Sequence, residues 1–175
     1  PRFVIGESLL PHSMDYLDEL NLLPAVEALK FQVKTGACFY HDGERCDFLF
    51  ENQFSKGWSY TFQVKRADFD HALIKEAEKQ GAEVEFQAEV TDVKTSAAKQ
   101  VVTYRDKNGD IHEVHCRFVM DASGYGRVLP QMFNLEVPVS TPPRGAVFAH
   151  CQRCRGAAAS GPYPHRCGNA GLLPR

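Results

Sequence analysis

The sequence lacks the features that would direct it to a membrane, to secretion or to a nucleic acid. No apolar run approaches the length of a membrane span, and no charged start followed by an apolar stretch marks a signal peptide. The formal net charge of −2 provides no electrostatic attraction to nucleic acid or to an anionic membrane. These absences predict a cytoplasmic globular protein whose partners include neither nucleic acid nor membrane.

The last part of the chain is short of acidic residues, of lysine and of any regular apolar spacing. No acidic residue follows Glu136, no lysine follows Lys107, and residues 151–175 consist mainly of Arg, Gly, Ala, Pro, Cys and His. Such a segment cannot bury enough apolar surface to offset the entropy that ordering costs. We therefore expect residues 151–175 to be disordered, and a change of reading frame near position 150 would explain the shift in composition.

Half of the six cysteines nevertheless fall in that segment. His150, Cys151 and Cys154, with His165 and Cys167 downstream, have side chains that could bind zinc. A small zinc-binding interaction module is therefore one alternative for the function. No apolar scaffold surrounds these residues to support a metal site, so no metal is predicted.

Helical and strand-like patterns alternate over the rest of the sequence. Leucines at helical spacing after Ser13, interrupted by Pro24, predict two short helices. Aromatic and β-forming residues dominate residues 31–62, and turn signals at 41–43 and 55–57 divide them into three expected strands. This part of the chain is therefore expected to place helices beside a sheet.

The clearest helix is expected over residues 68–80, with Asp68 as its N-cap and Gly81 just after its end. A short strand is expected over 82–86. An antiparallel meander is then expected within residues 88–116, with its strands at 89–94, 101–105 and 112–116 and an Asn108-Gly109 turn, followed by a buried strand at 118–122. The order of these elements predicts an α/β fold that is in part α+β.

Two motifs carry a family resemblance. Arg66-x-x-Phe69-Asp70 spans the start of the expected helix, and Asp121-Ala122-Ser123-Gly124 spans the end of the last expected strand. With Gly6-Glu7-Ser8, these motifs resemble those of the FAD-dependent monooxygenase and halogenase superfamily, and the resemblance covers about residues 1–150.

The resemblance implies an incomplete FAD/NAD(P)-binding Rossmann-like domain. Residues 1–30 and 64–136 are expected to form part of the FAD-binding domain, including the meander. Residues 31–63 and 137–150 are expected to form part of a substrate-facing sheet.

The same resemblance implies which residues of the first part of the chain contact FAD. The arginine that matches Arg66 lies beside the cofactor, and its fixed donors suit a pyrophosphate or the polar edge of the flavin. Glu7 and Ser8 match positions that touch FAD in the related halogenases. The alternatives are a surface arginine beside a helix and a simple strand-to-helix cap.

Three later residues complete the expected FAD site. Val90 matches a strand whose backbone lies against the adenine, with ordinary sheet packing as the alternative. Asp121 and Gly124 stand where a strand is expected to end. A carboxylate at such a place can meet a ligand, and a glycine lets the backbone approach that ligand, so both residues are expected to contact FAD. Turn geometry alone would also explain an aspartate and a glycine at this place.

Lys34 is the expected catalytic residue. The stretch Lys34-x-Gly36-Ala37-x-Phe39 is similar to one in flavin-dependent halogenases of phenols and pyrroles, in which the lysine holds or delivers the oxidised halogen. An ammonium in a low-dielectric tunnel can donate to an oxidant or, once deprotonated, act as a nucleophile. The alternative is a strand lysine that faces solvent.

Several motifs of the superfamily are missing. Gly124-Tyr125-Gly126 is followed by Leu129 where a Gly-x-Gly-x-x-Gly phosphate loop needs its third glycine, and neither the later Gly-Asp segment nor a Trp-x-Trp-x-Ile-Pro segment is present. We therefore expect an internal fragment that by itself binds FAD weakly or not at all and is inactive.

The expected function is that of a fragment of an FAD-dependent oxidoreductase. Such an enzyme oxygenates or halogenates an aromatic small molecule with reduced flavin and O2, and a separate NAD(P)H-dependent flavin reductase is a possible partner. A non-catalytic truncated product remains an alternative, beside the zinc-binding module.

Overall fold

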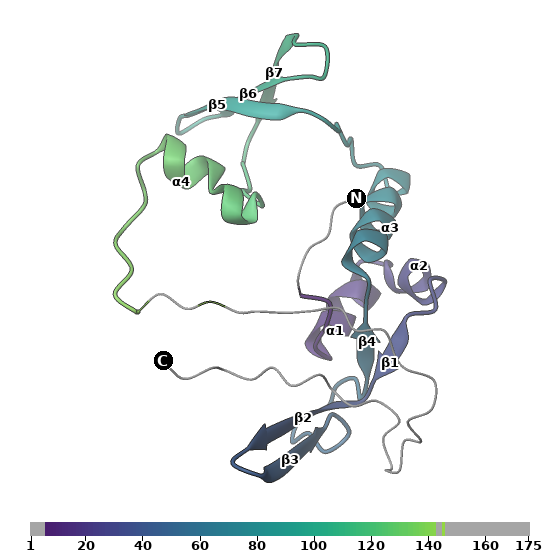
Figure 1. Cartoon of the computed structure of the whole chain (residues 1–175). Coiled ribbons are helices and arrows are strands. Elements are labelled where there is room, and N and C mark those ends of the chain that lie inside the picture. Colours follow the sequence, from purple (N-terminus) through teal and green to yellow (C-terminus); the bar gives the residue numbers. More distant parts are fainter. Residues whose placement is uncertain (1–5, 143–144, 146–175) are drawn as a thin grey trace. The chain divides into compact units, whose positions relative to one another are not determined.

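A computed structural model describes residues 6–142 and Gly145 of the chain (Figure 1). The described residues form two compact units, of which the first comprises residues 6–82 with Gly145 and the second comprises residues 83–142. The expected disordered tail at 151–175 and the zinc candidates within it lie outside the described residues. None of the described helices is long and apolar enough to cross a membrane.

The first unit begins with the two short helices that the leucine spacing predicts. Helix α1 spans His12–Glu19 and helix α2 spans Leu23–Glu27. Pro24 lies in the first turn of α2 and does not separate the helices, because the first turn of a helix leaves its N–H groups without partners in any case. The proline therefore marks where the second helix starts.

Helix α3 spans Arg66–Lys79 and starts two residues before the expected N-terminus. The expectation that Asp68 caps it is wrong: Lys65 holds the N-cap position without a side-chain cap, and Asp68 lies in the first turn. A carboxylate in that turn still favours the helix, because it faces the positive end of the helix dipole. Gly81 follows the helix with a φ of +100°, as the sequence predicts.

Four strands, not three, lie between α2 and α3. They are β1 (Gln32–Lys34), β2 (Gly36–His41), β3 (Glu44–Leu49) and β4 (Thr61–Gln63). Strand β1 pairs with β4, whereas β2 pairs with β3 as a separate hairpin, and both pairs are antiparallel. The expected first strand is thus divided between two sheets.

Gly36 explains why the division falls where it does. A Cβ atom at this position would lie 2.4 Å from the carbonyl oxygen of Phe48, so only glycine fits where β2 begins. The close approach of the two backbones lets the chain leave the β1–β4 pair and enter the hairpin.

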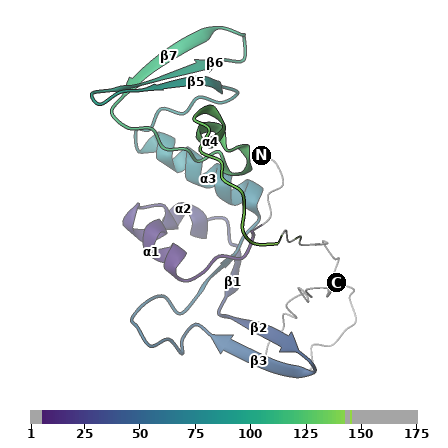
Figure 2. The ribbon, with the colours of Figure 1, turned by 90° about the vertical axis from the view of Figure 1, so that its left-hand side faces the viewer.

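The core of the first unit lies between the three helices and one face of β4. Helix α2 packs against both α1 and α3, and the three helices lie side by side in both views (Figure 2). The buried apolar cluster consists of Met14, Leu17, Leu23, Val26, Phe62, Val64 and Phe69. The helices therefore leave the opposite face of β4 for other groups.

The second unit contains the expected antiparallel meander. Strands β5 (Glu89–Thr95), β6 (Gln100–Arg105) and β7 (Ile111–Cys116) pair in sequence order, and a β-bulge interrupts the β5–β6 register after Val90. A 3₁₀ turn at Gly124–Gly126 leads into α4 (Val128–Met132), which packs against β5. This arrangement can be followed in Figure 2.

Two expected strands of this unit are wrong. Residues 82–86 and 118–122 form neither helix nor strand, and Phe118 and Met120 are 77% and 85% exposed. A strand exists only with a hydrogen-bonded neighbour, and none of the described residues supplies one to either segment. Apolar, β-forming composition is therefore not sufficient to make either segment a strand.

The turn between β6 and β7 falls where the Asn108-Gly109 pair predicts it. Only Gly109 of the Asn108-Gly109 pair has a positive φ, of +93°, and the two strands end at Arg105 and start at Ile111. Asp106 holds this loop, because its carboxylate accepts hydrogen bonds from the N–H groups of Asn108 and Asp110.

Candidate functional site

The candidate site is built on β4, which is hydrogen-bonded along both edges. Strand β1 pairs with one edge, and residues 7–9 lie along the other. The N–H of Val64 donates to the carbonyl oxygen of Glu7 at 2.7 Å, and the N–H of Leu9 donates to that of Phe62 at 3.2 Å. Glu7 and Ser8, which the family resemblance links to FAD, are thus fixed beside β4. The other edge of β4 pairs with β1, the strand that carries Lys34.

The pairing register places five polar side chains on one face of this small sheet. Lys34 is opposite Thr61 on the neighbouring strand, while Gln32 and Ser8 are both opposite Gln63. Directly opposite residues share a face, and residues two apart along a strand do so as well. We name this set of five residues the polar face. The core helices pack against the other side.

Lys34 belongs to the polar face, on the edge strand β1, and is partly buried. Its Nζ donates to Ser8 Oγ at 2.7 Å and to the carbonyl oxygen of Leu9 at 3.1 Å. It also lies 5.2 Å from the centroid of the Phe50 ring, within the range of a cation–π interaction. The structure therefore brings together Ser8 and Lys34, for which the sequence suggested separate roles.

Thr61 is a residue of the polar face that sequence reasoning missed. It is fully buried, and its hydroxyl oxygen has no hydrogen-bond partner among the described residues. Leaving a buried hydroxyl unsatisfied costs about 1–3 kcal/mol. No sequence signal distinguishes such a threonine from the many that occupy strands for their β-branched shape.

Arg66 is held at the start of α3 by a two-pronged ion pair. Its Nε and Nη2 donate to the two carboxylate oxygens of Asp70 at 2.9 and 3.1 Å. Its Nη1 lies 3.3 Å from where a Cβ atom on Gly6 would be, and Gly6 has a φ of +102°. The guanidinium therefore lies against the backbone of the segment that leads to Glu7 and Ser8.

Asp121 caps its own turn in the second unit. Its carboxylate accepts hydrogen bonds from the N–H of Ser123 at 2.8 Å and of Leu129 at 2.9 Å. The hydroxyl and N–H of Ser123, followed by the N–H of Leu129, hold the pKa of Asp121 below its usual value. These local hydrogen bonds explain why an acidic residue stands here.

Gly124 and Val90 lie elsewhere in the same unit. Gly124 has a φ of +58° with open space where a side chain would stand, so the backbone conformation is what requires glycine. Val90 is opposite Tyr104 at the bulge of β5 and is 38% exposed. The roles of Val90, Asp121 and Gly124 in binding FAD stay predictions, as do those of Glu7, Ser8 and Arg66.

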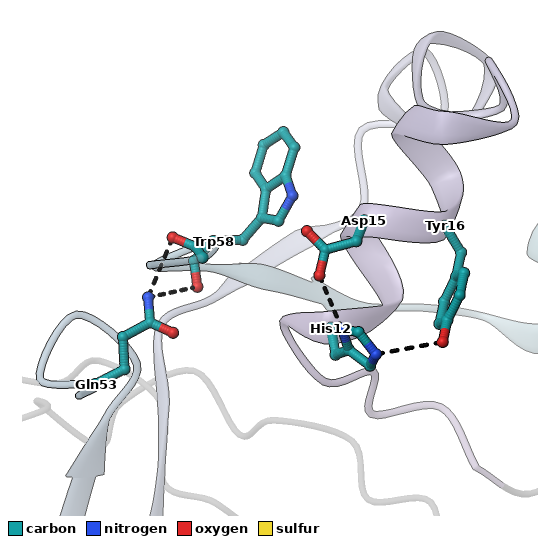
Figure 3. Close-up of polar contacts among 6 residues, drawn as sticks. His12, Asp15, Tyr16, Gln53 and Trp58 are labelled. Atoms are coloured by element: carbon teal, nitrogen blue, oxygen red, sulfur yellow. Dashed lines mark hydrogen bonds and ion pairs between the residues drawn. The ribbon is translucent and has the colours of Figure 1, made fainter. Parts of the chain in front are cut away.

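Two further polar clusters of the first unit are shown in Figure 3. His12 lies between Asp15, at 2.8 Å, and Tyr16, at 3.2 Å, on the surface of α1. The side-chain amide of Gln53 donates to the carbonyl oxygen of Trp58 at 3.3 Å and so closes the loop between β3 and β4. Neither cluster includes a residue of the polar face.

No group of three potential metal ligands occurs among the described residues. The histidines and cysteines of the zinc alternative lie at 150–167, outside these residues.

Comparison with known proteins identifies the family. Residues 6–141 match the model of the FAD binding domain. A flavoprotein/dehydrogenase from Cytophaga hutchinsonii is 50% identical in its crystal structure, with a TM-score of 0.77 over 81% of this chain and 35% of that one. The tryptophan 2-halogenase of Chondromyces crocatus is 35% identical over 126 residues, 71% of this chain and 24% of the relative. The flavin-dependent halogenase CmlS is 33% identical, with a TM-score of 0.69 over 76% of this chain and 24% of that one.

The chain therefore belongs to the FAD-dependent monooxygenase and halogenase family, and its mixture of helices and antiparallel sheets is part of an α/β FAD-binding fold. Both expectations from the sequence are confirmed. The chain spans 24–35% of the length of the three relatives named above.

The cofactor of this family is FAD, and the residues of the first unit suit it. The missing Cβ of Gly6 leaves room for the Arg66 guanidinium beside the backbone, and guanidinium donors match phosphate oxygens. Whether Arg66 meets the pyrophosphate or the polar edge of the flavin stays open, and its contact with FAD stays a prediction.

Proposed function

We propose that this chain supplies one wall of the site of an FAD-dependent oxidoreductase that halogenates or oxygenates a small aromatic molecule. In this proposal Arg66 binds the cofactor and Lys34 is the catalytic residue on the substrate side. The observation that carries the proposal is the hydrogen bond from Lys34 Nζ to Ser8 Oγ, 2.7 Å long. It joins the strand of the expected catalytic lysine to the segment expected to bind FAD.

The contacts of Lys34 support a chemical role. A lysine with its head group between a hydroxyl, a carbonyl oxygen and an aromatic ring has given up rotational freedom that a solvent-facing lysine keeps. Bound FAD would supply the oxidising chemistry with O2. Lys34 would then hold an oxidised halogen or oxygen species by donating hydrogen bonds to it beside the substrate.

The names of the relatives support an aromatic substrate. One relative is a tryptophan 2-halogenase, and another, 27% identical over 149 residues, is a 1H-pyrrole-2-carbonyl-[peptidyl-carrier protein] chlorinase of Pseudomonas fluorescens. Indole and pyrrole are both electron-rich aromatic rings. The flavoprotein/dehydrogenase of Cytophaga hutchinsonii favours a second candidate, a flavin-dependent dehydrogenase, because it is 50% identical.

Substitution of Lys34 separates the two candidates. The gene product that carries this chain is supplied with FAD, a flavin reductase, NADH, O2, bromide and a panel of indoles, phenols and pyrroles, and halide incorporation is measured by mass spectrometry. Lys34→Ala is expected to abolish incorporation and to leave FAD affinity unchanged, because the lysine acts on the substrate side. Lys56→Ala, in an exposed loop, is the matched control and should retain both.

Halide incorporation that survives Lys34→Ala would refute the role of the lysine. If the unaltered protein incorporates no halide and no oxygen but reduces an artificial electron acceptor, the dehydrogenase candidate is favoured instead.

A further inference from the structure

The contacts of Lys34 favour its charged form as well as fix its place. The carbonyl oxygen of Leu9, 3.1 Å from Lys34 Nζ, accepts an N–H, and an ammonium donates a stronger hydrogen bond than a neutral amine does. The Ser8 hydroxyl lies at 2.7 Å, a length typical of a charge-assisted hydrogen bond. The face of the Phe50 ring attracts a cation. Each of the three groups favours the ammonium over the neutral amine.

The Phe50 ring is a fixed platform. Phe50 is 4% exposed, and its N–H donates to the carbonyl oxygen of Thr35 at 2.9 Å. Its ring also meets that of Phe48 edge to face, with centroids 5.9 Å apart. Because Thr35 directly follows Lys34, this backbone bond ties the ring to the strand that carries the lysine.

Ser8 is fixed just as firmly, from the other edge of β4. It forms an antiparallel bridge with Gln63, and its neighbours Glu7 and Leu9 are bonded to the β4 strand and the residue after it. Ser8 and Lys34 are 26 residues apart in sequence, so their contact is a product of the tertiary fold and not of local geometry.

We propose that Ser8 and Phe50 are positioning residues that hold Lys34 as an ammonium ion on the polar face, where it acts as a hydrogen-bond donor and not as a nucleophile. This inference rests on the proposed function, in which Lys34 is the catalytic residue. It gives Ser8 a role distinct from the flavin contact that the family resemblance implies.

The test measures how fast each lysine of the purified chain is acetylated by a limiting amount of acetic anhydride, because only the neutral amine reacts. Peptide mass spectrometry gives the rates of Lys34 and of the exposed Lys56 in the same sample. Lys34 is expected to react about tenfold more slowly than Lys56, as loss of a charge-assisted hydrogen bond costs at least that factor. Ser8→Ala should raise the rate of Lys34 about tenfold, and Ser8→Thr, which restores the hydroxyl, should return it to the original value.

Ser55→Ala, an exposed serine between β3 and β4, is the matched control and should leave the rate of Lys34 unchanged. Phe50→Leu removes the ring face and should raise the rate as well. If Phe50→Leu does not fold, the acetylation rates of Lys34 in the Ser8 variants test the inference by themselves. Equal rates for Lys34 in the unaltered chain, in Ser8→Ala and in Ser55→Ala would overturn the inference.

The assay uses neither FAD nor halide, so its outcome is independent of the proposed function. Slow acetylation of Lys34 that becomes faster in Ser8→Ala would support the positioning role, even in a protein that incorporates no halide. Halide incorporation that depends on Lys34 but not on Ser8 would support the proposed function and reject the positioning role.

Discussion

At the scale of single residues, the polar face combines a held cation with a buried hydroxyl. Lys34 has partners for its charge, whereas Thr61 directly opposite has a buried oxygen with no partner among the described residues. Natural proteins keep such costs mainly where function requires them. Thr61 is therefore the position at which stability and function are expected to conflict.

Thr61→Val tests this conflict. Valine has nearly the same shape without the hydroxyl, so the free energy of unfolding should rise by about 1 kcal/mol. Urea unfolding followed by the fluorescence of Trp58, the single tryptophan, measures the change in the first unit. Thr35→Val, at an exposed threonine of the same unit, should bring no such gain. A loss of stability in Thr61→Val would show that the hydroxyl has a partner in solution.

At the scale of elements, the β6–β7 loop shows how one side chain organises a turn. Asp106 accepts hydrogen bonds from the N–H groups of Asn108, at 2.8 Å, and Asp110, at 3.0 Å, and its other oxygen lies 3.0 Å from His112 Nε2. The His112 ring in turn stacks on Tyr104. The carboxylate thus organises the turn that Asn108 and Gly109 predict.

This loop is expected to loosen in acid. The hydrogen bond from His112, followed by those from the N–H groups of Asn108 and Asp110, holds the pKa of Asp106 below its usual value. A carboxylate with a lowered pKa in the folded state contributes stability above its unfolded pKa of about 3.9, and this is lost as the pH falls through the folded pKa.

NMR of the Asn108 and Asp110 amides measures this transition. The chemical shifts of these two amides should change with pH, with a midpoint below the pKa of an ordinary aspartate. Asp106→Asn should remove this transition. A midpoint at or above the ordinary value would contradict the hydrogen-bonding role of Asp106.

At the scale of the whole molecule, the two units differ in how much apolar surface they bury. Of the nine buried hydrophobic residues in the described part of the chain, eight belong to the first unit, and Val93 alone belongs to the second. Burial of apolar side chains is the main source of stability, so the first unit has the more stable core.

The rates of amide hydrogen exchange should therefore differ between the two units. We expect the amides of β4 and α3 to exchange much more slowly than those of β5, β6 and β7, because segments with few buried contacts open at lower free energy. Exchange of the purified chain, followed by mass spectrometry of its peptides, gives both sets in one experiment. Meander amides that exchange as slowly as those of β4 would show that the second unit has a core of its own in solution.

The sequence by itself determined the elements whose signals are local. Leucine spacing marked α1 and α2, Gly81 marked the end of α3, and the Asn108-Gly109 turn marked the meander, because periodicity and turn chemistry act within a few residues. The family motifs also indicated the class of protein and its cofactor.

Only the tertiary structure decided what depends on partners distant in sequence. Residues 118–122 have strand-like composition but find no neighbour among the described residues, and the 31–41 stretch divides between two sheets because Gly36 meets the backbone of Phe48. The contact of Lys34 with Ser8 and the burial of Thr61 likewise arise from pairing across β4. Which side chains meet on a sheet is set by strand register, and register is fixed by the packing of the whole unit.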